Sequence, residues 1–136
     1  MHTTNYKNTF IEVVEDSPVL KSEIPPVKRN TTLAEIQFEM ISNNPYKYTS
    51  DEVMLACYVQ KNDIPESEII QAKNEFFSKG QPCFRSSALA KRYGFGIHHD
   101  EDGKIAIFSV ESVEYERFVN DDTIKKVKAM RAKRAQ

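Results

Sequence analysis

The stretch Gly80–Asp100 contains several side chains that could perform chemistry. It holds Cys83 and, near its end, the adjacent histidines His98 and His99. A cysteine beside a histidine can form a thiolate–imidazole nucleophile, and a histidine can also act as a general acid or base. Cys83 and His98 are therefore the candidate catalytic residues of a small enzyme. The alternative is a semi-buried thiol in a connecting segment, because no nucleophile-elbow pattern accompanies the cysteine.

The same stretch places basic side chains beside serines at the expected start of a short helix. Exposed backbone N–H groups and nearby cations favour a phosphate or a carboxylate. We therefore predict an anion-binding surface over residues 83–98. Its candidate members are Arg85, Ser86, Ser87, Lys91, Tyr93, Phe95 and His98. Gly94 and Gly96 leave room for a backbone or a ligand, but they form no dinucleotide or phosphate-loop motif. The alternative is a capped short helix with a solvated basic face.

The two adjacent histidines do not by themselves make a metal site. Neighbouring residues of a strand point to opposite faces, so at most one of His98 and His99 can serve a given site. Cys57 and Cys83 also lack the close spacing of a metal-binding pair. We predict no bound metal and no cofactor. The alternative has one histidine buried and hydrogen-bonded and the other at the surface.

The C-terminal residues 121–136 are basic, with six basic and two acidic side chains, although the whole chain has a net charge of −1. Asp121 or Asp122 can start a helix through "IKKVKAMRAKR", with Ile124, Val127 and Met130 on one side. Such a helix could lie on nucleic acid phosphates or an acidic partner. Its basic residues are Lys125, Lys126, Lys128, Arg131, Lys133 and Arg134. The alternative is an amphipathic helix docked on the domain, and the sequence does not favour nucleic acid as a partner.

The elements that must position these residues follow from periodicity and turn signals. Alternation predicts a covered or central strand at "NTFIEVVED" and a hairpin near 95–110. Thr32, Ser50, Ser86 or Ser87, and Ser112 are placed to start helices. Residues 53–59 fit either a helix or a strand, because a short apolar run is ambiguous. Further helices are predicted at "LAEIQFEMIS", after Pro65 and at "VEYERFV".

Together these elements predict an α+β fold: a small antiparallel sheet packed by several helices. The 136 residues fit a single domain, residues 1–136, with no second-domain boundary. No apolar run approaches the roughly 20 residues of a membrane helix, and the N-terminus lacks a secretory pattern. We therefore expect a cytoplasmic protein whose two cysteines are free thiols.

Several stretches together resemble one family of small bacterial proteins that is catalogued as a domain of unknown function. They are "MHTTNYKNTFIEVVEDSP", "EIPP", "NPYKYTSDEV", "FFSKGQPCFRSSALAKRYGFGIH" and "KAMRAKRA". The resemblance spans nearly the whole chain and implies a bacterial cytosolic source, but it carries over no activity, cofactor or catalytic residue. From the residues themselves we favour a non-catalytic domain that binds an anionic small molecule or a protein partner and is able to form a homodimer. The alternatives are the small enzyme and the nucleic-acid accessory protein described above.

Overall fold

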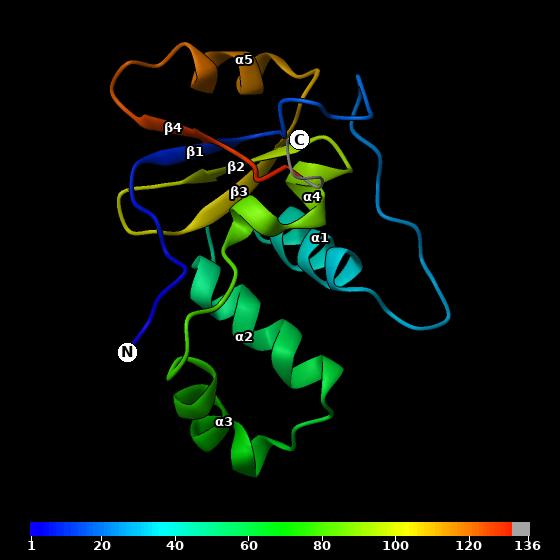
Figure 1. Ribbon diagram of the computed structural model, residues 1–136, viewed down its shortest axis with the longest axis vertical. Helices are drawn as coiled ribbons and strands as arrows, with labels where there is room; N and C mark the ends of the chain where they lie inside the picture. The colour runs from blue at the N-terminus through cyan, green and yellow to red at the C-terminus, as the bar shows by residue number, and fades with distance from the viewer. Residues whose placement is uncertain (132–136) are drawn as a thin grey trace.

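A four-stranded sheet lies between helices in the computed structural model, which describes residues 1–131 (Figure 1). The strands are β1 (Thr9–Glu12), β2 (Phe95–His99), β3 (Ile105–Ser109) and β4 (Lys125–Lys128). The α-helices are α1 (Leu33–Asn43), α2 (Ser50–Lys61), α3 (Ile69–Phe76), α4 (Ala88–Lys91) and α5 (Val113–Val119). Short 3-10 turns, Glu66–Glu68 and Phe84–Ser86, precede α3 and α4. The predicted α+β class is confirmed.

The strand order β3-β2-β1-β4 makes β1 a central strand, as its two apolar faces predicted. The predicted hairpin is also present, because β2 and β3 are antiparallel neighbours. The Asp100 carboxylate closes its turn by accepting from the N–H groups of Asp102 and Lys104. Gly103 adopts a φ of 80° there, a left-handed conformation that favours glycine.

The predicted C-terminal helix is wrong within the described residues, since β4 occupies residues 125–128 instead. β4 pairs in parallel with β1, with Val127 opposite Ile11, so the sheet is mixed rather than purely antiparallel. The Asp121 carboxylate accepts from the Thr123 N–H, a local bond that serves a turn as well as a helix start. Lys133 and Arg134 lie outside the described residues.

Helices α1 and α4 cover one face of the sheet, where Ile11, Ile97 and Ile105 point, and Val53 and Cys57 of α2 join the same buried cluster. Thr32 caps α1 and Ser87 caps α4, as predicted. Residues 53–59 are helical. The cap of α2 is Thr49 rather than Ser50, because Thr49 and Glu52 form a reciprocal capping box.

Helix α5 covers the opposite face of the sheet and starts at the predicted cap, Ser112. Its Tyr115 and Phe118 pack on Phe10 of β1, with ring centroids 5.0 and 4.9 Å from the Phe10 ring. These rings cover Gly96, where a Cβ would lie 2.4 Å from Phe10 Cζ and 2.6 Å from Tyr115 Cε2. The close approach predicted at this glycine is therefore made by two side chains of the chain itself.

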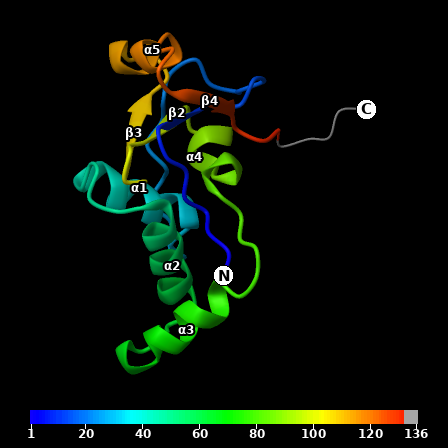
Figure 2. The same ribbon diagram turned by 90° about the vertical axis from the view of Figure 1, so that its left-hand side faces the viewer.

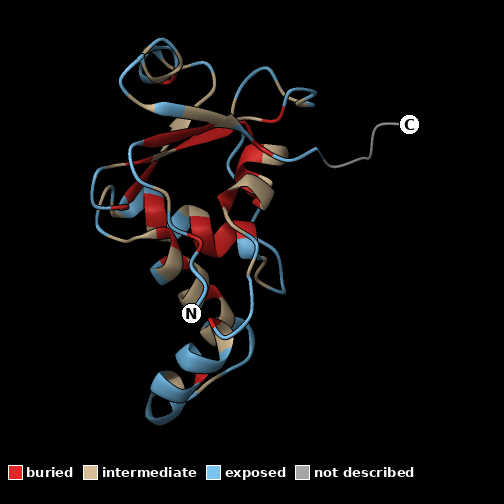
Figure 3. Ribbon diagram, turned by 60° about the vertical axis from the view of Figure 1, so that its left-hand side comes forward, coloured by how far each residue is buried: buried red, intermediate tan, exposed pale blue. Residues whose placement is uncertain are grey.

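Helices α2 and α3 extend from the sheet as an arm (Figure 2). Much of the arm is exposed, whereas buried residues gather at the sheet, α1 and α4 (Figure 3). The N-terminal segment is hydrogen-bonded to the arm. The His2 N–H donates to the Phe77 carbonyl, and the Thr4 N–H donates to the Asp51 carboxylate of α2. Across residues 1–131, no helix has the length and apolar character needed to cross a membrane.

Candidate ligand-binding cavity

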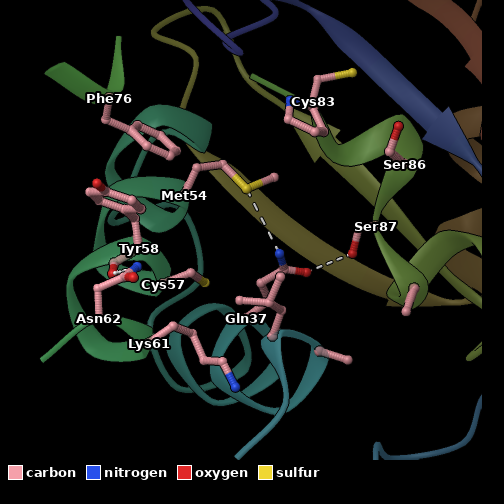
Figure 4. Close-up of a pocket in the computed structure, with 14 residues that line it drawn as sticks. Gln37, Met54, Cys57, Tyr58, Lys61, Asn62, Phe76, Cys83, Ser86 and Ser87 are labelled. Atoms are coloured by element: carbon pink, nitrogen blue, oxygen red, sulfur yellow. Dashed lines mark hydrogen bonds between the residues drawn. The ribbon is translucent and has the colours of Figure 1, made fainter. Parts of the chain in front are cut away.

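An open cavity of about 590 Å³ lies where the arm meets the rest of the domain (Figure 4). Its walls come from α1, α2, the end of α3 and the connector 82–88 that returns the chain to the sheet. The wall atoms that face the cavity are predominantly apolar. The apolar lining residues are Leu33, Ala34, Met54, Phe76, Pro82 and Ala88.

The residues with polar side chains expose little polar surface to the cavity and come mainly from α1, α2 and the connector. They are Gln37, Tyr58, Lys61, Asn62, Ser86 and Ser87, together with the two cysteines. The Tyr58 ring packs against the Phe76 ring at 4.8 Å, so it presents an aromatic face to α3. The Lys61 ammonium donates a hydrogen bond of 2.8 Å to the Thr31 carbonyl, which holds this exposed cation at the rim of the cavity.

Gln37 is the most deeply buried polar residue of this wall, with 5% of its surface exposed, and Ser87 follows at 6%. Its Oε1 accepts a hydrogen bond of 2.6 Å from the Ser87 hydroxyl. Its Nε2 faces the Met54 sulfur at 3.8 Å. The pair therefore joins α1 to the start of α4 across the cavity wall, as Figure 4 shows.

The Cys57 thiol lies in the same wall but is not activated. Burial raises its pKa to about 11, although the neighbouring Gln37 amide acts in the opposite direction. The thiol is therefore protonated near neutral pH and a poor nucleophile. The sequence leaves this residue on either a helix or a strand and does not assign it to a site.

The Cys83 sulfur points away from the cavity, toward the N-terminal segment (Figure 4). It lies 3.2 Å from the Tyr6 hydroxyl, and desolvation raises the pKa of that phenol to about 12. The Tyr6 ring in turn packs edge-on to His99, with centroids 5.2 Å apart. Within residues 1–131 the hydrogen-bond partner of Cys83 is thus the Tyr6 phenol, and the structure does not bring Cys83 together with His98.

The two histidines lie on opposite faces of the sheet, as the strand geometry predicted. His98 Nδ1 bonds to the Tyr46 hydroxyl at 2.8 Å, and its ring stacks on Phe118 under α5. Burial lowers its pKa, with Asp100 opposing the shift. The imidazole therefore favours its neutral form.

His99 is fully buried on the other face, and neither ring nitrogen has a hydrogen-bond partner among the described residues. Burial lowers its pKa to about 4. The inward histidine of the alternative considered from the sequence is therefore present, but its ring nitrogens lack the hydrogen bond that this alternative gave it. Within residues 1–131, no group of three potential ligands is placed to hold a metal ion.

The seven residues predicted to form one anion-binding surface divide among several places. Ser87 faces the first cavity, Lys91 faces a second one, and Ser86 lines both. Arg85 donates its Nε–H to the Lys128 carbonyl at 2.8 Å and so supports β4. Tyr93 and Phe95 belong to the buried core, and His98 lies across the sheet.

The second cavity has a volume of about 610 Å³ and lies beside α4. Lys91 and Arg92 contribute its cationic side chains, and Asp16 contributes a carboxylate. An anion bound there would be attracted by the two cations and repelled by the Asp16 carboxylate. Binding of an anionic ligand stays a prediction.

The basic residues near the C-terminus also have structural roles. Lys125, Lys126 and Lys128 lie on β4, an edge strand, where charged side chains oppose pairing with another chain. Arg131 forms an ion pair with Glu15 at 3.0 Å. Both partners of this ion pair are exposed, so it adds little stability, and neither feature tests nucleic-acid binding.

The chain is a small α+β domain: α5 lies on one face of a mixed sheet, α1 and α4 lie on the other, and an open, mainly apolar cavity lies where the helical arm begins. The chain belongs to the family of unknown function DUF6157, whose model matches residues 1–135. No curated protein and no solved structure matches the chain significantly. The bacterial source, cytoplasmic location, protein partner and homodimer stay predictions.

Proposed function

We propose that this protein is a non-catalytic binding domain that takes a small, mainly apolar molecule into the cavity between α1, α2 and the connector 82–88. The observation that carries the proposal is the cavity itself. Its volume of about 590 Å³ is within the range of small-molecule sites, roughly 300–1,000 Å³. Its apolar walls with a few polar groups are also typical of such sites.

The chemistry around the cavity supports binding rather than catalysis. The Cys57 thiol is held protonated by burial, and the Cys83 sulfur is turned toward Tyr6. The His98 and His99 imidazoles lie on β2 and do not line the cavity. A nucleophile and a base within hydrogen-bonding reach are what the enzyme alternative requires, and these groups do not supply the pair.

The test is a titration with a neutral apolar fluorescent dye, a naphthalene that carries a dimethylamino and a propionyl group. We expect saturable binding at one site in the wild-type protein. Met54→Trp should weaken binding at least about tenfold, because the indole fills space that the cavity offers. Ile70→Trp is the matched control, since Ile70 is 79% exposed on α3 and does not line the cavity.

Ala88→Leu fills the same cavity from the opposite wall and guards against a folding defect in Met54→Trp. Thermal melting of each variant should show a cooperative transition. Binding that is absent in the wild type, or unchanged in both filled variants, would contradict the proposal.

A further inference from the structure

The Gln37 side chain gives the cavity a directional hydrogen-bond donor. The residue is 5% exposed, and its amide stands in a wall that is otherwise predominantly apolar. A buried amide has one acceptor oxygen and two N–H donors, all of which need partners. Which end of the amide faces the cavity interior decides what a ligand must offer.

The Ser87 hydroxyl fixes the orientation of this amide. Ser87 Oγ already accepts a hydrogen bond of 3.1 Å from the Leu89 N–H as the cap of α4. Its own proton is thus free to be donated, and the Gln37 Oε1 receives it at 2.6 Å. If the Gln37 oxygen and nitrogen were exchanged, the Ser87 hydroxyl proton would have no acceptor within residues 1–131. The NH₂ group therefore points away from Ser87.

Within residues 1–131, the hydrogen-bond acceptors of the Gln37 NH₂ group are sulfur atoms. Its Nε2 lies 3.8 Å from the Met54 Sδ, and the Cys57 thiol is the other neighbour that it influences. Thioether and thiol sulfurs are weak acceptors, so much of the capacity of the two N–H donors is unused. An oxygen acceptor brought into this apolar site would form a stronger bond than sulfur does.

The charges around the cavity indicate that this oxygen is uncharged. Among the lining residues, Lys61 carries the charge, and its ammonium is held at the rim by the Thr31 carbonyl. A carboxylate placed beside Gln37 would lose its hydration without an ion pair, at a considerable free-energy cost. The neutral oxygen of a ketone, ester or amide avoids that cost.

We propose that the cavity selects apolar molecules whose uncharged carbonyl oxygen accepts a hydrogen bond from the Gln37 amide. This proposal rests on the proposed function and adds the class of ligand. The supporting geometry is the Ser87–Gln37–Met54 chain of contacts, which presents an oriented donor in an apolar wall.

The experiment compares two dyes that differ in one group: the propionyl-bearing naphthalene and the same dimethylaminonaphthalene without the propionyl group. Each is titrated against the wild type, Gln37→Met and the matched control Gln60→Met, whose glutamine is exposed on α2. Methionine keeps the length of the side chain and removes its N–H donors. We expect the wild type and the control to prefer the ketone about tenfold, and Gln37→Met to lose that preference.

The double variant Gln37→Met with Ser87→Ala keeps the test valid if the single change disturbs folding, because it removes the hydroxyl left without its acceptor. It should also bind both dyes equally. Equal binding by the wild type, or a ketone preference that survives in a folded Gln37 variant, would overturn the inference while the apolar site stands. If neither dye binds the wild type, the proposed function fails and this inference fails with it.

Discussion

Replacing His99 with phenylalanine should make the stability of the protein less sensitive to acid. His99 is fully buried, and its ring nitrogens have no hydrogen-bond partner among the described residues. A charged imidazole at this position would be desolvated, and the nearby Ile97 and Thr9 backbone and Asp100 offset only part of that cost, so the folded state favours the neutral ring. Phenylalanine keeps an aromatic ring beside Tyr6, which His99 meets edge-on.

The size of the effect follows from the pKa of His99 in the folded and unfolded states. Burial lowers this pKa from 6.5 to about 4 in the folded protein. Below pH 6.5 the unfolded chain binds a proton that the folded state resists, so the free energy of unfolding falls as pH falls. The stabilisation is complete above the unfolded pKa and declines toward the folded one. The loss reaches about 2 kcal/mol at pH 5 and about 3 kcal/mol at pH 4.

Urea unfolding followed by circular dichroism measures this free energy directly. Curves at about pH 7.5 and about pH 5 give the loss for the wild type and for His99→Phe, and their difference isolates His99 from other titrating groups. We expect the wild type to lose about 2 kcal/mol more than the variant. His99→Leu provides a second non-titrating replacement if phenylalanine packs poorly. Parallel pH profiles for the wild type and both variants would refute the reasoning.

Two further predictions concern the packing of the sheet and the reactivity of the cavity wall. Gly96→Ala should destabilise the domain by about 1–3 kcal/mol in urea unfolding, because a Cβ would lie 2.4 Å from Phe10 Cζ and 2.6 Å from Tyr115 Cε2; an unchanged midpoint would contradict the described packing. Cys57 should react slowly with an aromatic disulfide reagent at neutral pH, because burial raises its pKa to about 11. In Cys83→Ser the one remaining thiol, Cys57, should react rapidly with the reagent only after the protein is unfolded. Rapid reaction in the native variant would contradict the burial of Cys57.

The parts of the fold that depend on local chemistry could be predicted from the sequence. Thr32, Ser87 and Ser112 each accept a backbone N–H bond at a helix start, and that signal lies within a few residues. The hairpin at 95–110 is equally local, because its strands are joined by one short turn. The alternation of β1 also indicated a strand covered on both faces.

The C-terminal strand depends on a partner that is distant in the sequence. Ile124, Val127 and Met130 have a spacing that fits a helix, and Asp121 can begin one. The deciding interaction is the parallel pairing of β4 with β1, which lies more than a hundred residues away. Local periodicity carries no information about that pairing, so the residues were assigned to the wrong element.

The candidate site was located only in part. The connector 82–88 does form one wall of the cavity, but the other walls come from α1 and α2. Gln37 was missed, although it lies four residues from both Leu33 and Ile41 on an otherwise apolar stripe of α1. A polar residue in such a stripe is a signal for a buried hydrogen-bond network. Its orientation toward Ser87 could not be predicted, because the two residues meet only in the folded chain.

The most direct test of the cavity as a binding site is an NMR titration of isotope-labelled protein with the propionyl-bearing dye. We predict saturable shifts at the Gln37 side-chain amide, the Met54 methyl group, Ala34 and Ala88, which surround the cavity. Tyr115 of α5, across the sheet from the cavity, should be unaffected. An absence of shifts, or shifts that gather on the α5 face while the cavity resonances stay in place, would contradict it.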